Sequence, residues 1–376
     1  MSFGVYVHIP FCASRCDYCD FATWTDRDHL VAAYVAACVV DLERRDGRGE
    51  LVPATSVFFG GGTPSLLPAA DLVRILDAVP RARDAEVTVE CNPDSVDVAK
   101  LAAYREAGVD RLSFGVQSMR THVLAALGRT HDPDNVDRAV ESARAAGFER
   151  LNLDLIYGTP GETLADWRAT LEGALALDPP HVSAYALTVE PATPLGQRVA
   201  TGAQPAPDDD DQADKYVLAD QMLGAAGLDW YEVSNWARPG HECRHNLLAW
   251  EQGDYVGIGC AAHGHRDGRR WWNVRTPERY VDRITQGAAP EGGAEELDPP
   301  TRREERLCLA LRTRAGVEAA GLPVAVIDDL VSAGLLTSAA GRVALTRRGR
   351  LLATDVTARL LAAGEAPSLA LGTLEC

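Results

Sequence analysis

The sequence has no long apolar run and a deficit of positive charge. None of its hydrophobic stretches approaches the roughly 20 residues that a membrane-spanning helix needs. Residues 1–10 lack the basic start and the apolar core of a secretory signal peptide. A membrane-embedded or exported protein is therefore not expected, and the cytoplasm is the favoured compartment.

Acidic residues outnumber basic ones, with 54 Asp and Glu against 37 Lys and Arg, and the net charge is −17. This charge would repel a nucleic-acid backbone except at a local basic patch, so we expect no nucleic-acid partner. A hydrophobic content of 46% and a charged content of 24% are ordinary for a folded protein. The 376 residues suffice for one barrel-sized domain and a smaller one, and no internal repeat is visible.

Three of the nine cysteines, Cys12, Cys16 and Cys19, form a C-x3-C-x2-C pattern. Thiolates at this spacing can hold three irons of a 4Fe–4S cluster and leave the fourth iron without a protein ligand. Zinc is the first alternative, but it needs a fourth ligand, for which His8 is the nearest candidate. The odd cysteine count disfavours disulfides. Spacing alone favours a cluster and leaves zinc and unrelated thiols open.

Short β-type runs alternate with helical patterns through the first half of the chain. We expect strands at residues 4–9, 56–59, 86–91, 111–116, 151–156 and 181–186. Helical patterns fill residues 29–44, 69–79, 96–107, 134–146 and 164–176. Alternation of this kind predicts an α/β fold with a parallel sheet, and six units suffice for a partial, incompletely closed (βα)6 TIM-like barrel.

Polar residues lie at the ends of these expected strands. Cys12, Gly60, Glu90 and Gln117 come at or just after the ends of the first four, and Asp154 lies within the fifth. The carboxyl edge of the strands is where a βα-barrel builds its active site. We therefore expect these five positions to converge.

Each of these residues also has a structural interpretation. The run Gly60–Pro64 lets backbone groups approach an amino-acid ligand, or it is only a tight turn. Glu90 needs hydrogen-bond donors, which ribose hydroxyls would supply, or it forms a salt bridge or a helix cap to the next turn. A buried Asp154 needs a partner. Gln117 offers a donor and an acceptor, and Arg129 a fork suited to a carboxylate. Together they describe a pocket for a nucleoside attached to an amino acid.

The second half of the chain differs from the first in composition and in the pattern of expected elements. The acidic run 208–211 precedes a helical pattern at 212–223, which favours charge at a helix N-terminus over a metal site. A polar and aromatic stretch follows from residue 230 to residue 250, and then a Gly-rich strand is expected at 257–265. Residues 287–300 have the composition of a linker.

The C-terminal segment has the pattern of a small winged-helix-like domain. Helices are expected at 302–314 and 323–333, then a hairpin turning at Ala340-Gly341, then a helix at 348–361. The basic cluster Arg347, Arg348 and Arg350 is modest. We therefore interpret this domain as a lid or partner surface rather than a DNA reader.

The chain resembles a known superfamily in several motifs. The cysteine pattern after a first strand and the run Gly60–Pro64 are similar to the radical S-adenosylmethionine (SAM) superfamily. Residues 6–12, 114–118 and 154–158 resemble, more narrowly, the oxygen-independent coproporphyrinogen III oxidase group. This resemblance covers nearly the whole chain.

The resemblance implies site residues. Cys12, Cys16 and Cys19 would bind the cluster, whose open iron would chelate the amino and carboxylate groups of SAM. Tyr18 would flank the cluster, and Ala186 would line the adenine. The positions implied to contact SAM are Tyr6, Gly61, Gly62, Thr63, Glu90, Gln117, Arg129 and Asp154.

Two branches of that group differ in features that this sequence displays. The oxidases carry a cysteine at the position of Phe21 and an N-terminal extension, whereas this chain starts directly in the first expected strand. The HemW-like heme chaperones carry an HNxxYW motif, which residues 245–250 match except for Ala249 in place of tyrosine. Histidine beside aromatic residues suits heme, so His245 is the expected heme ligand, and a packed core histidine or a capping histidine is the alternative. Lesser candidates are His241, Cys243 and His263.

The expected function is that of a HemW-like heme chaperone that binds a 4Fe–4S cluster, SAM and heme and passes heme to hemoproteins such as respiratory enzymes. The alternative is an oxidase that cleaves SAM reductively and decarboxylates two propionates of coproporphyrinogen III, so the residues leave enzymatic activity open. We expect the cluster and SAM site in residues 1–190, a barrel extension with the heme segment in residues 191–290, and the winged-helix-like domain in residues 300–376. A homodimer is compatible with the sequence.

Overall fold

The structure is a computed structural model that describes residues 2–129 and 132–363. Its contacts divide the chain into two compact units. The barrel unit consists of residues 1–230, 234–249 and 253–296, and the C-terminal unit consists of residues 231–233, 250–252 and 297–376. Each unit has its own apolar core.

Six parallel strands form the centre of the large sheet. They pair in chain order, and the predicted alternation is confirmed: β1 (Phe3–Ile9), β2 (Ala54–Gly61), β3 (Arg81–Cys91), β4 (Arg111–Gln117), β5 (Arg150–Tyr157) and β6 (His181–Ala186). The full order is β12-β11-β10-β9-β1-β2-β3-β4-β5-β6-β8-β7. Since β12 and β7 each have a single neighbour, the sheet is curved but open, as expected for a partial barrel.

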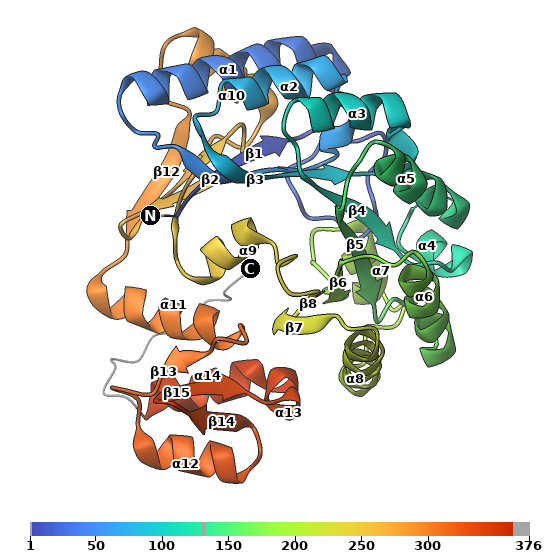
Figure 1. Cartoon of the computed structure of the whole chain (residues 1–376), viewed down its shortest axis with the longest axis vertical. Coiled ribbons are helices and arrows are strands. Elements are labelled where there is room, and N and C mark those ends of the chain that lie inside the picture. Colours follow the sequence, from blue (N-terminus) through green and yellow to red (C-terminus); the bar gives the residue numbers. More distant parts are fainter. Residues whose placement is uncertain (1, 130–131, 364–376) are drawn as a thin grey trace. The chain divides into compact units, whose positions relative to one another are not determined.

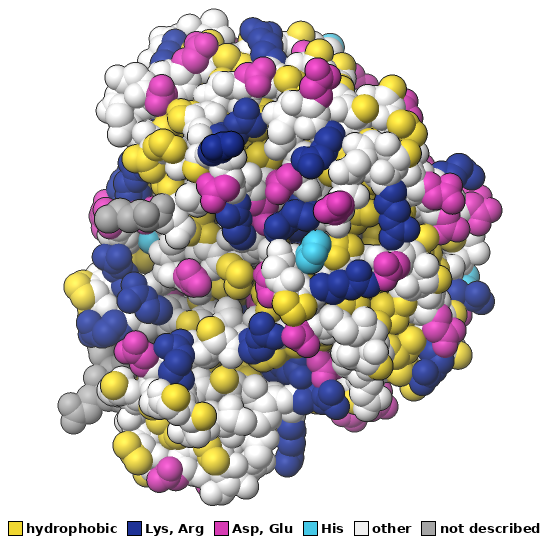
Figure 2. Space-filling view, viewed as in Figure 1, with side chains coloured by type: hydrophobic (Ala, Val, Ile, Leu, Met, Phe, Trp, Pro, Cys, Tyr) yellow, Lys and Arg dark blue, Asp and Glu magenta, His cyan; other side chains and the backbone are white. Residues whose placement is uncertain are grey.

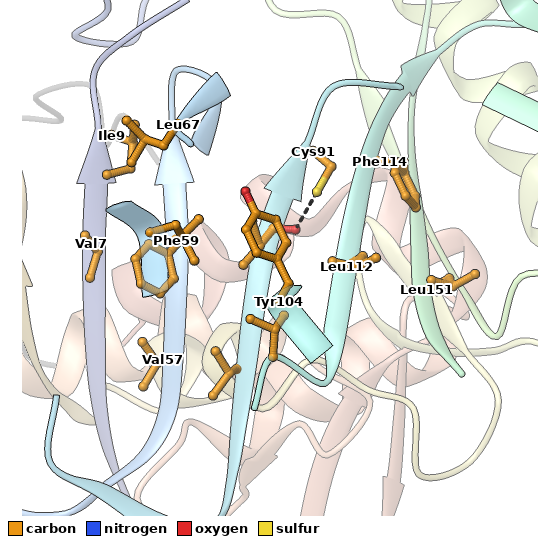
Figure 3. Close-up of a cluster of buried hydrophobic side chains, with 14 of the residues drawn as sticks. Val7, Ile9, Val57, Phe59, Leu67, Cys91, Tyr104, Leu112, Phe114 and Leu151 are labelled. Carbon is orange, nitrogen blue, oxygen red and sulfur yellow. Dashed lines mark hydrogen bonds between the residues drawn. The ribbon is translucent and has the colours of Figure 1, made fainter. Parts of the chain in front are cut away.

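Helices cover the outer face of these six strands (Figure 1). They are α1 (Val31–Gly47), α2 (Ala69–Asp77), α3 (Val98–Glu106), α4 (Thr121–Ala126), α5 (Pro133–Ala145) and α6 (Leu164–Ala176), with 3-10 turns at Asp28–Leu30, Pro64–Leu66 and Pro93–Ser95. Along each strand, successive side chains point to opposite faces of the sheet, so outward-facing and inward-facing positions alternate. Val7 and Phe59 are fully buried in the outer core beside Tyr104 of α3 (Figure 3), whereas Tyr6 and His8 face inward.

The part of the chain after β6 extends the sheet at both ends. The added strands are β7 (Asp229–Glu232), β8 (Asn235–Ala237), β9 (Asp254–Ile258), β10 (His263–Arg266), β11 (Arg269–Asn273) and β12 (Glu291–Glu296). The added helices are α7 (Pro194–Ala200), α8 (Asp209–Ala225), α9 (Arg244–Trp250) and α10 (Pro277–Thr285). Asp208 accepts a hydrogen bond from the Asp211 N–H at 2.9 Å, so the acidic run is the helix N-terminus that the sequence predicted.

Two expectations for this part of the chain were wrong. Residues 257–265 are not one strand, because Gly259 (φ 97°) and Ala261 (φ 55°) turn the chain with left-handed backbone between β9 and β10. The segment 287–300 is not only a linker, because β12 lies within it and pairs antiparallel with β11. Its glycines at 292 and 293 weakened the strand signal in the sequence, and pairing with β11 supplies what local propensity does not.

The C-terminal unit contains α11 (Pro299–Leu311), α12 (Val324–Ser332), α13 (Arg347–Leu351), α14 (Ala353–Ala362) and a three-stranded sheet of β13 (Val317–Glu318), β15 (Arg342–Leu345) and β14 (Leu336–Ala339). The predicted helices and hairpin are present. The last helix, however, is interrupted at Leu352, whose φ of −119° and ψ of 29° are not helical. Among the described residues, no helix has the length and apolar character needed to cross a membrane.

Candidate functional site

The three cysteines lie in one loop that begins where β1 ends. The loop is closed across its base by hydrogen bonds from the Cys12 N–H to the Trp24 carbonyl at 3.0 Å and from the Trp24 N–H to the Pro10 carbonyl at 2.8 Å. The Cys19 N–H donates to the Cys16 carbonyl at 3.2 Å and tightens the inner turn. All three thiols are partly exposed and free.

The glycine run at the end of β2 contacts this loop closely. The Gly62 N–H donates to the Ile9 carbonyl at 2.8 Å, and the Thr63 N–H donates to the Phe11 carbonyl at 2.9 Å. A Cβ on Gly62 would lie 2.7 Å from the Phe11 carbonyl oxygen and 2.9 Å from Cys12 Sγ, so no side chain fits there. Glycine at this position therefore serves the close approach of the two loops as well as any ligand.

Donors point at the sulfur atoms. The Thr63 hydroxyl donates to Cys12 Sγ at 3.7 Å, and Arg129 Nη1 donates to Cys16 Sγ at 3.6 Å. Burial raises the pKa of Cys12 and of Cys19, so thiolates here need such compensation. Three thiols in one loop with hydrogen-bond donors directed at them fit the ligand set of a 4Fe–4S cluster.

A single ion has a different geometry from a cluster. In the described ranges, no three His, Cys, Asp or Glu side chains converge on one ion position. In a cluster each thiolate binds a different iron, so its ligands need not converge on one point.

The carboxylates expected beside SAM face the inside of the barrel. Glu90, at the end of β3, accepts a hydrogen bond from the Gly61 N–H at 3.1 Å. Burial, and then the charge of Asp154, raise the pKa of Glu90 to about 8. Asp154 accepts from the Ser113 hydroxyl at 2.7 Å and from the Asn152 amide at 2.9 Å, and burial raises its pKa. The polar network of β4 and β5 therefore supplies the partners that the buried Asp154 carboxylate needs.

Gln117 has an unusual backbone conformation. Its φ is 65°, in the left-handed region, and the β4–β5 register shifts between Gly115 and Gln117. Strained conformations at strand ends are typical of functional sites. Gly115 provides the space, because a Cβ there would lie 3.2 Å from Gln117 Nε2 and 3.5 Å from Arg129 Nη2. The Gly115 carbonyl also accepts a hydrogen bond from Arg129 Nη2 at 2.8 Å.

Tyr18 and Ala186 lie on the β6 side of the site. Tyr18 packs against a small apolar cluster of Leu127, Ile156, Leu187 and Leu195. The neighbouring Asp17 fixes this part of the loop, since its N–H donates to the Leu127 carbonyl at 3.0 Å and its carbonyl accepts from the Leu195 N–H at 2.9 Å. Ala186 is exposed at the end of β6, where it pairs with Tyr157.

His8 is a structural link that the sequence indicated only as a zinc candidate. Its Nε2 donates to the Ala22 carbonyl at 2.9 Å, so Nδ1 carries no proton and accepts from the Tyr6 hydroxyl at 3.1 Å. Burial lowers the pKa of His8 to about 4, which keeps the ring neutral. With both nitrogens in hydrogen bonds, His8 connects β1 to the end of the cysteine loop and does not serve as a free ligand.

His245 lies on α9, which sits on the inner side of the curved sheet, away from the outer helices (Figure 1). Its ring stacks on Phe58 at 5.3 Å and on Tyr6 at 6.4 Å between centroids, and Tyr255 meets its edge at 6.4 Å. Nδ1 and the Ser56 hydroxyl are 3.0 Å apart. Among the described residues, Nε2 has no hydrogen-bond partner. Burial lowers the pKa of His245 to about 4.

The start of α9 is held by Glu86, which the sequence did not single out. This fully buried carboxylate on β3 accepts hydrogen bonds from the Arg244 N–H at 2.8 Å and the His245 N–H at 3.3 Å. It also pairs with Arg150 at 2.7 Å and accepts from Cys243 Sγ at 3.6 Å. A charged residue in an inward strand position is a signal that could have identified it.

A cavity of about 460 Å³ opens between β1, α9, β9 and the residues that follow Cys19. This volume is in the usual range of small-molecule sites. Tyr6 and Gly61 belong both to this cavity and to the residues expected around SAM. The lining residues are Tyr6, His8, Asp20, Phe21, Ala22, Gly61, His245, Leu248, Ala249, Tyr255, Ala261, His263 and Arg275.

The fold and the cysteine loop define a class of protein. The model of the radical SAM superfamily matches residues 6–174. The coproporphyrinogen III oxidase HemN of Escherichia coli has a similar solved structure, with a TM-score of 0.81 at 21% identity over 96% of this chain and 90% of that chain. Residues 6–174 therefore match a radical SAM domain, and the similar structure confirms the predicted fold. A radical SAM domain implies a 4Fe–4S cluster and SAM as cofactors.

Curated relatives narrow the family. The chain is 43% identical to the heme chaperone HemW of Mycobacterium tuberculosis over 96% of this chain and 95% of the relative. It is 36% identical to the protein of the same name in Escherichia coli over 96% and 98% of the two chains, and 35% identical to that of Bacillus subtilis over 94% and 97%. The chain belongs to the HemW family.

Proposed function

We propose that the protein is a heme chaperone that binds a 4Fe–4S cluster, SAM and heme and transfers heme to hemoproteins such as respiratory enzymes. The observation that carries this proposal is His245, a neutral imidazole at a cavity beside the cysteine loop whose Nε2 has no hydrogen-bond partner in residues 2–129 and 132–363. Neutral imidazole is a common axial ligand of heme iron, and aromatic walls suit the porphyrin face. The relatives named heme chaperone HemW support the same function.

In this proposal each part of the barrel unit has a role. Cys12, Cys16 and Cys19 hold the cluster, and Thr63 and Arg129 stabilise the thiolates. The cluster, when bound, supplies an iron that chelates SAM. The residues proposed to bind SAM are Tyr6, Gly61, Gly62, Thr63, Glu90, Gln117, Arg129 and Asp154, with Tyr18 beside the cluster and Ala186 at the adenine.

Further parts of the proposal concern partners and location. We place the heme segment in residues 191–290 and a partner surface in residues 300–376, and a homodimer is an assembly to test. On the face in Figure 2, Lys and Arg side chains are interspersed with Asp and Glu, which fits a protein without a nucleic-acid partner. Reduced thiols at Cys12, Cys16 and Cys19 fit the cytoplasm as its compartment.

The competing function is oxidative decarboxylation of coproporphyrinogen III. Its support is the similarity to the HemN structure, which is a similarity of fold alone. Phe21 speaks against it. The resemblance puts a cysteine at this position in the oxidases, and here the side chain is a phenyl ring, 63% exposed and lining the cavity. A phenyl ring there can cover an apolar ligand but cannot replace thiol chemistry.

The test is a hemin titration of the reconstituted full chain under anaerobic conditions, followed by an assay for vinyl formation from coproporphyrinogen III on the same sample. We expect a Soret band that saturates with hemin, a weaker affinity and a shifted band in His245→Ala, and no vinyl product. Unaltered hemin binding by His245→Ala would refute the ligand assignment. Sustained vinyl formation would favour the oxidase.

A further inference from the structure

Of the described residues that line the cavity beside His245, two carry a full charge. They are Arg275 and Asp20. The three histidines of the lining are neutral, because burial lowers the pKa of His8, His245 and His263. No ion pair joins Arg275 to Asp20 or to any other described residue. A cation that lines a cavity without a partner is a candidate for binding an anionic ligand.

Arg275 is held in place by its backbone rather than by its side chain. It follows Val274, whose N–H donates to the Pro290 carbonyl at 2.8 Å and whose carbonyl accepts from the Ala261 N–H at 3.0 Å. This double connection fixes the segment between β11 and α10 against the turn that precedes β10. The guanidinium is exposed and free to take a ligand without breaking an existing contact.

The remaining lining is suited to a flat, largely apolar molecule. Phe21 is 63% exposed and lines the cavity, as does His263, whose ring lies 6.1 Å from that of Trp272, a 38% exposed residue outside the lining. The Phe21 ring offers a flat apolar surface at the cavity. Ala249, where the motif has tyrosine, is exposed and leaves space on the α9 side.

We propose that Arg275 binds a propionate carboxylate of the porphyrin while His245 faces the iron. This inference rests on the proposed heme function and adds the residue that recognises the acidic edge of the ring. A tetrapyrrole with propionates is an anion, and a chain with a net charge of −17 repels it unless a local cation compensates. The planar fork of arginine binds carboxylates through two parallel hydrogen bonds.

The experiment compares two ligands and three variants of the full chain. Hemin and hemin dimethyl ester, which lacks the carboxylates, are titrated in the same detergent into the wild type, Arg275→Gln and Arg279→Gln. Arg279 is a matched control, since it is equally exposed on α10 but does not line the cavity. Thermal melting of each variant verifies that the fold is intact.

We expect Arg275→Gln to weaken hemin binding about tenfold, the effect of one charge-assisted contact. The affinity for the dimethyl ester should be the same in the wild type and Arg275→Gln, and Arg279→Gln should match the wild type for both ligands. The Soret position should not change, because Arg275 does not touch the iron.

Hemin binding that Arg275→Gln leaves unchanged, or an equal loss for the ester, would overturn the role of Arg275 and leave the heme function intact. Absence of saturable hemin binding by the wild type would overturn the heme function and, with it, this inference. The two failures are therefore distinct.

Discussion

At the scale of single residues, the site is built on close contacts that leave no room for other side chains. A Cβ on Gly61 would lie 2.5 Å from the His8 ring, and a Cβ on Gly62 would collide with the cysteine loop. His8 in turn uses both nitrogens to connect Tyr6 with Ala22. The position of the three thiols therefore depends on neighbours that are not themselves ligands.

We expect Gly62→Ala to lose most of its cluster. The added Cβ would lie 2.7 Å from the Phe11 carbonyl oxygen and 2.9 Å from Cys12 Sγ, so the cysteine loop must shift, at a cost of about 1–3 kcal/mol. Iron and sulfide content after anaerobic reconstitution is the measurement. Gly47→Ala is the control, because nothing lies within 4 Å of a Cβ there. Normal iron content in Gly62→Ala would refute the need for this close contact.

Glu90 should make the apo-protein less stable as the pH rises. Its pKa lies near 8 in the folded protein because of burial and the Asp154 charge, against an ordinary value of 4.5. Between these two pH values the folded state binds more protons than the unfolded state, so the free energy of unfolding decreases as the pH rises through this window. Below the window the contribution of Glu90 to stability is complete.

The measurement is the melting temperature of the apo-protein from pH 5 to pH 8. Because the residue in Glu90→Gln cannot titrate, the melting temperature of this variant should decrease less as the pH rises. Some decrease should remain, because burial also raises the pKa of Asp154. The exposed Glu141→Gln on α5 serves as the control. Parallel curves for Glu90→Gln and the wild type would contradict the assignment.

At the scale of elements, α9 is the decisive one. It is a helix of 7 residues, too short to be stable by itself, and it lies inside the curved sheet because Glu86 caps its first N–H groups and Ser56, Phe58 and Tyr6 contact His245. Its last residue, Trp250, belongs to the C-terminal unit, where the Arg312 guanidinium lies 4.9 Å from the ring centre. The HNxxYW-like segment thus takes part in both units.

We expect Glu86→Gln to destabilise the protein by about 3–5 kcal/mol, because it leaves Arg150 without its buried partner. Hemin affinity should fall as the start of α9 loosens, whereas the iron content of the cluster should not change. Urea unfolding and hemin titration measure the two effects. Glu242→Gln makes the same change in a partly exposed carboxylate that accepts a hydrogen bond from the Gly240 N–H, and it is the matched control. Wild-type stability of Glu86→Gln would exclude this anchoring role.

At the scale of the whole molecule, the two units have separate apolar cores. The core of the C-terminal unit includes Leu311, Leu330, Val343 and Val356 and contains no residue of the barrel core. Separate cores favour unfolding in separate steps.

Leu330→Ala should therefore destabilise the C-terminal unit alone, by about 2–5 kcal/mol, since the side chain is fully buried. Hydrogen exchange followed by mass spectrometry should show lost protection in residues 297–363 and unchanged protection in β1–β6. Val331→Ala, on the same helix but 38% exposed, should have little effect. Equal loss of protection in β1–β6 would mean that the chain unfolds as one unit.

The sequence by itself determined the features that depend on local pattern. Hydrophobic periodicity predicted all six central strands, and it put Glu90 and Gln117 at the ends of two of them and Asp154 within a third. The spacing of Cys12, Cys16 and Cys19 indicated a cluster because all three ligands belong to one loop. Such patterns involve residues that are close together in the sequence, so the sequence alone is enough to recognise them.

Only the tertiary structure decided what depends on contacts between distant segments. The docking of α9 on Glu86, 158 residues away from Arg244, left no local pattern, and neither did the position of Arg275 at the cavity. The turn at Gly259 and Ala261 and the pairing of β12 likewise overrode local propensity. His245 was a motif residue in the sequence, and it became a candidate ligand with a cavity in front of it because folding brought β1, α9 and β9 together.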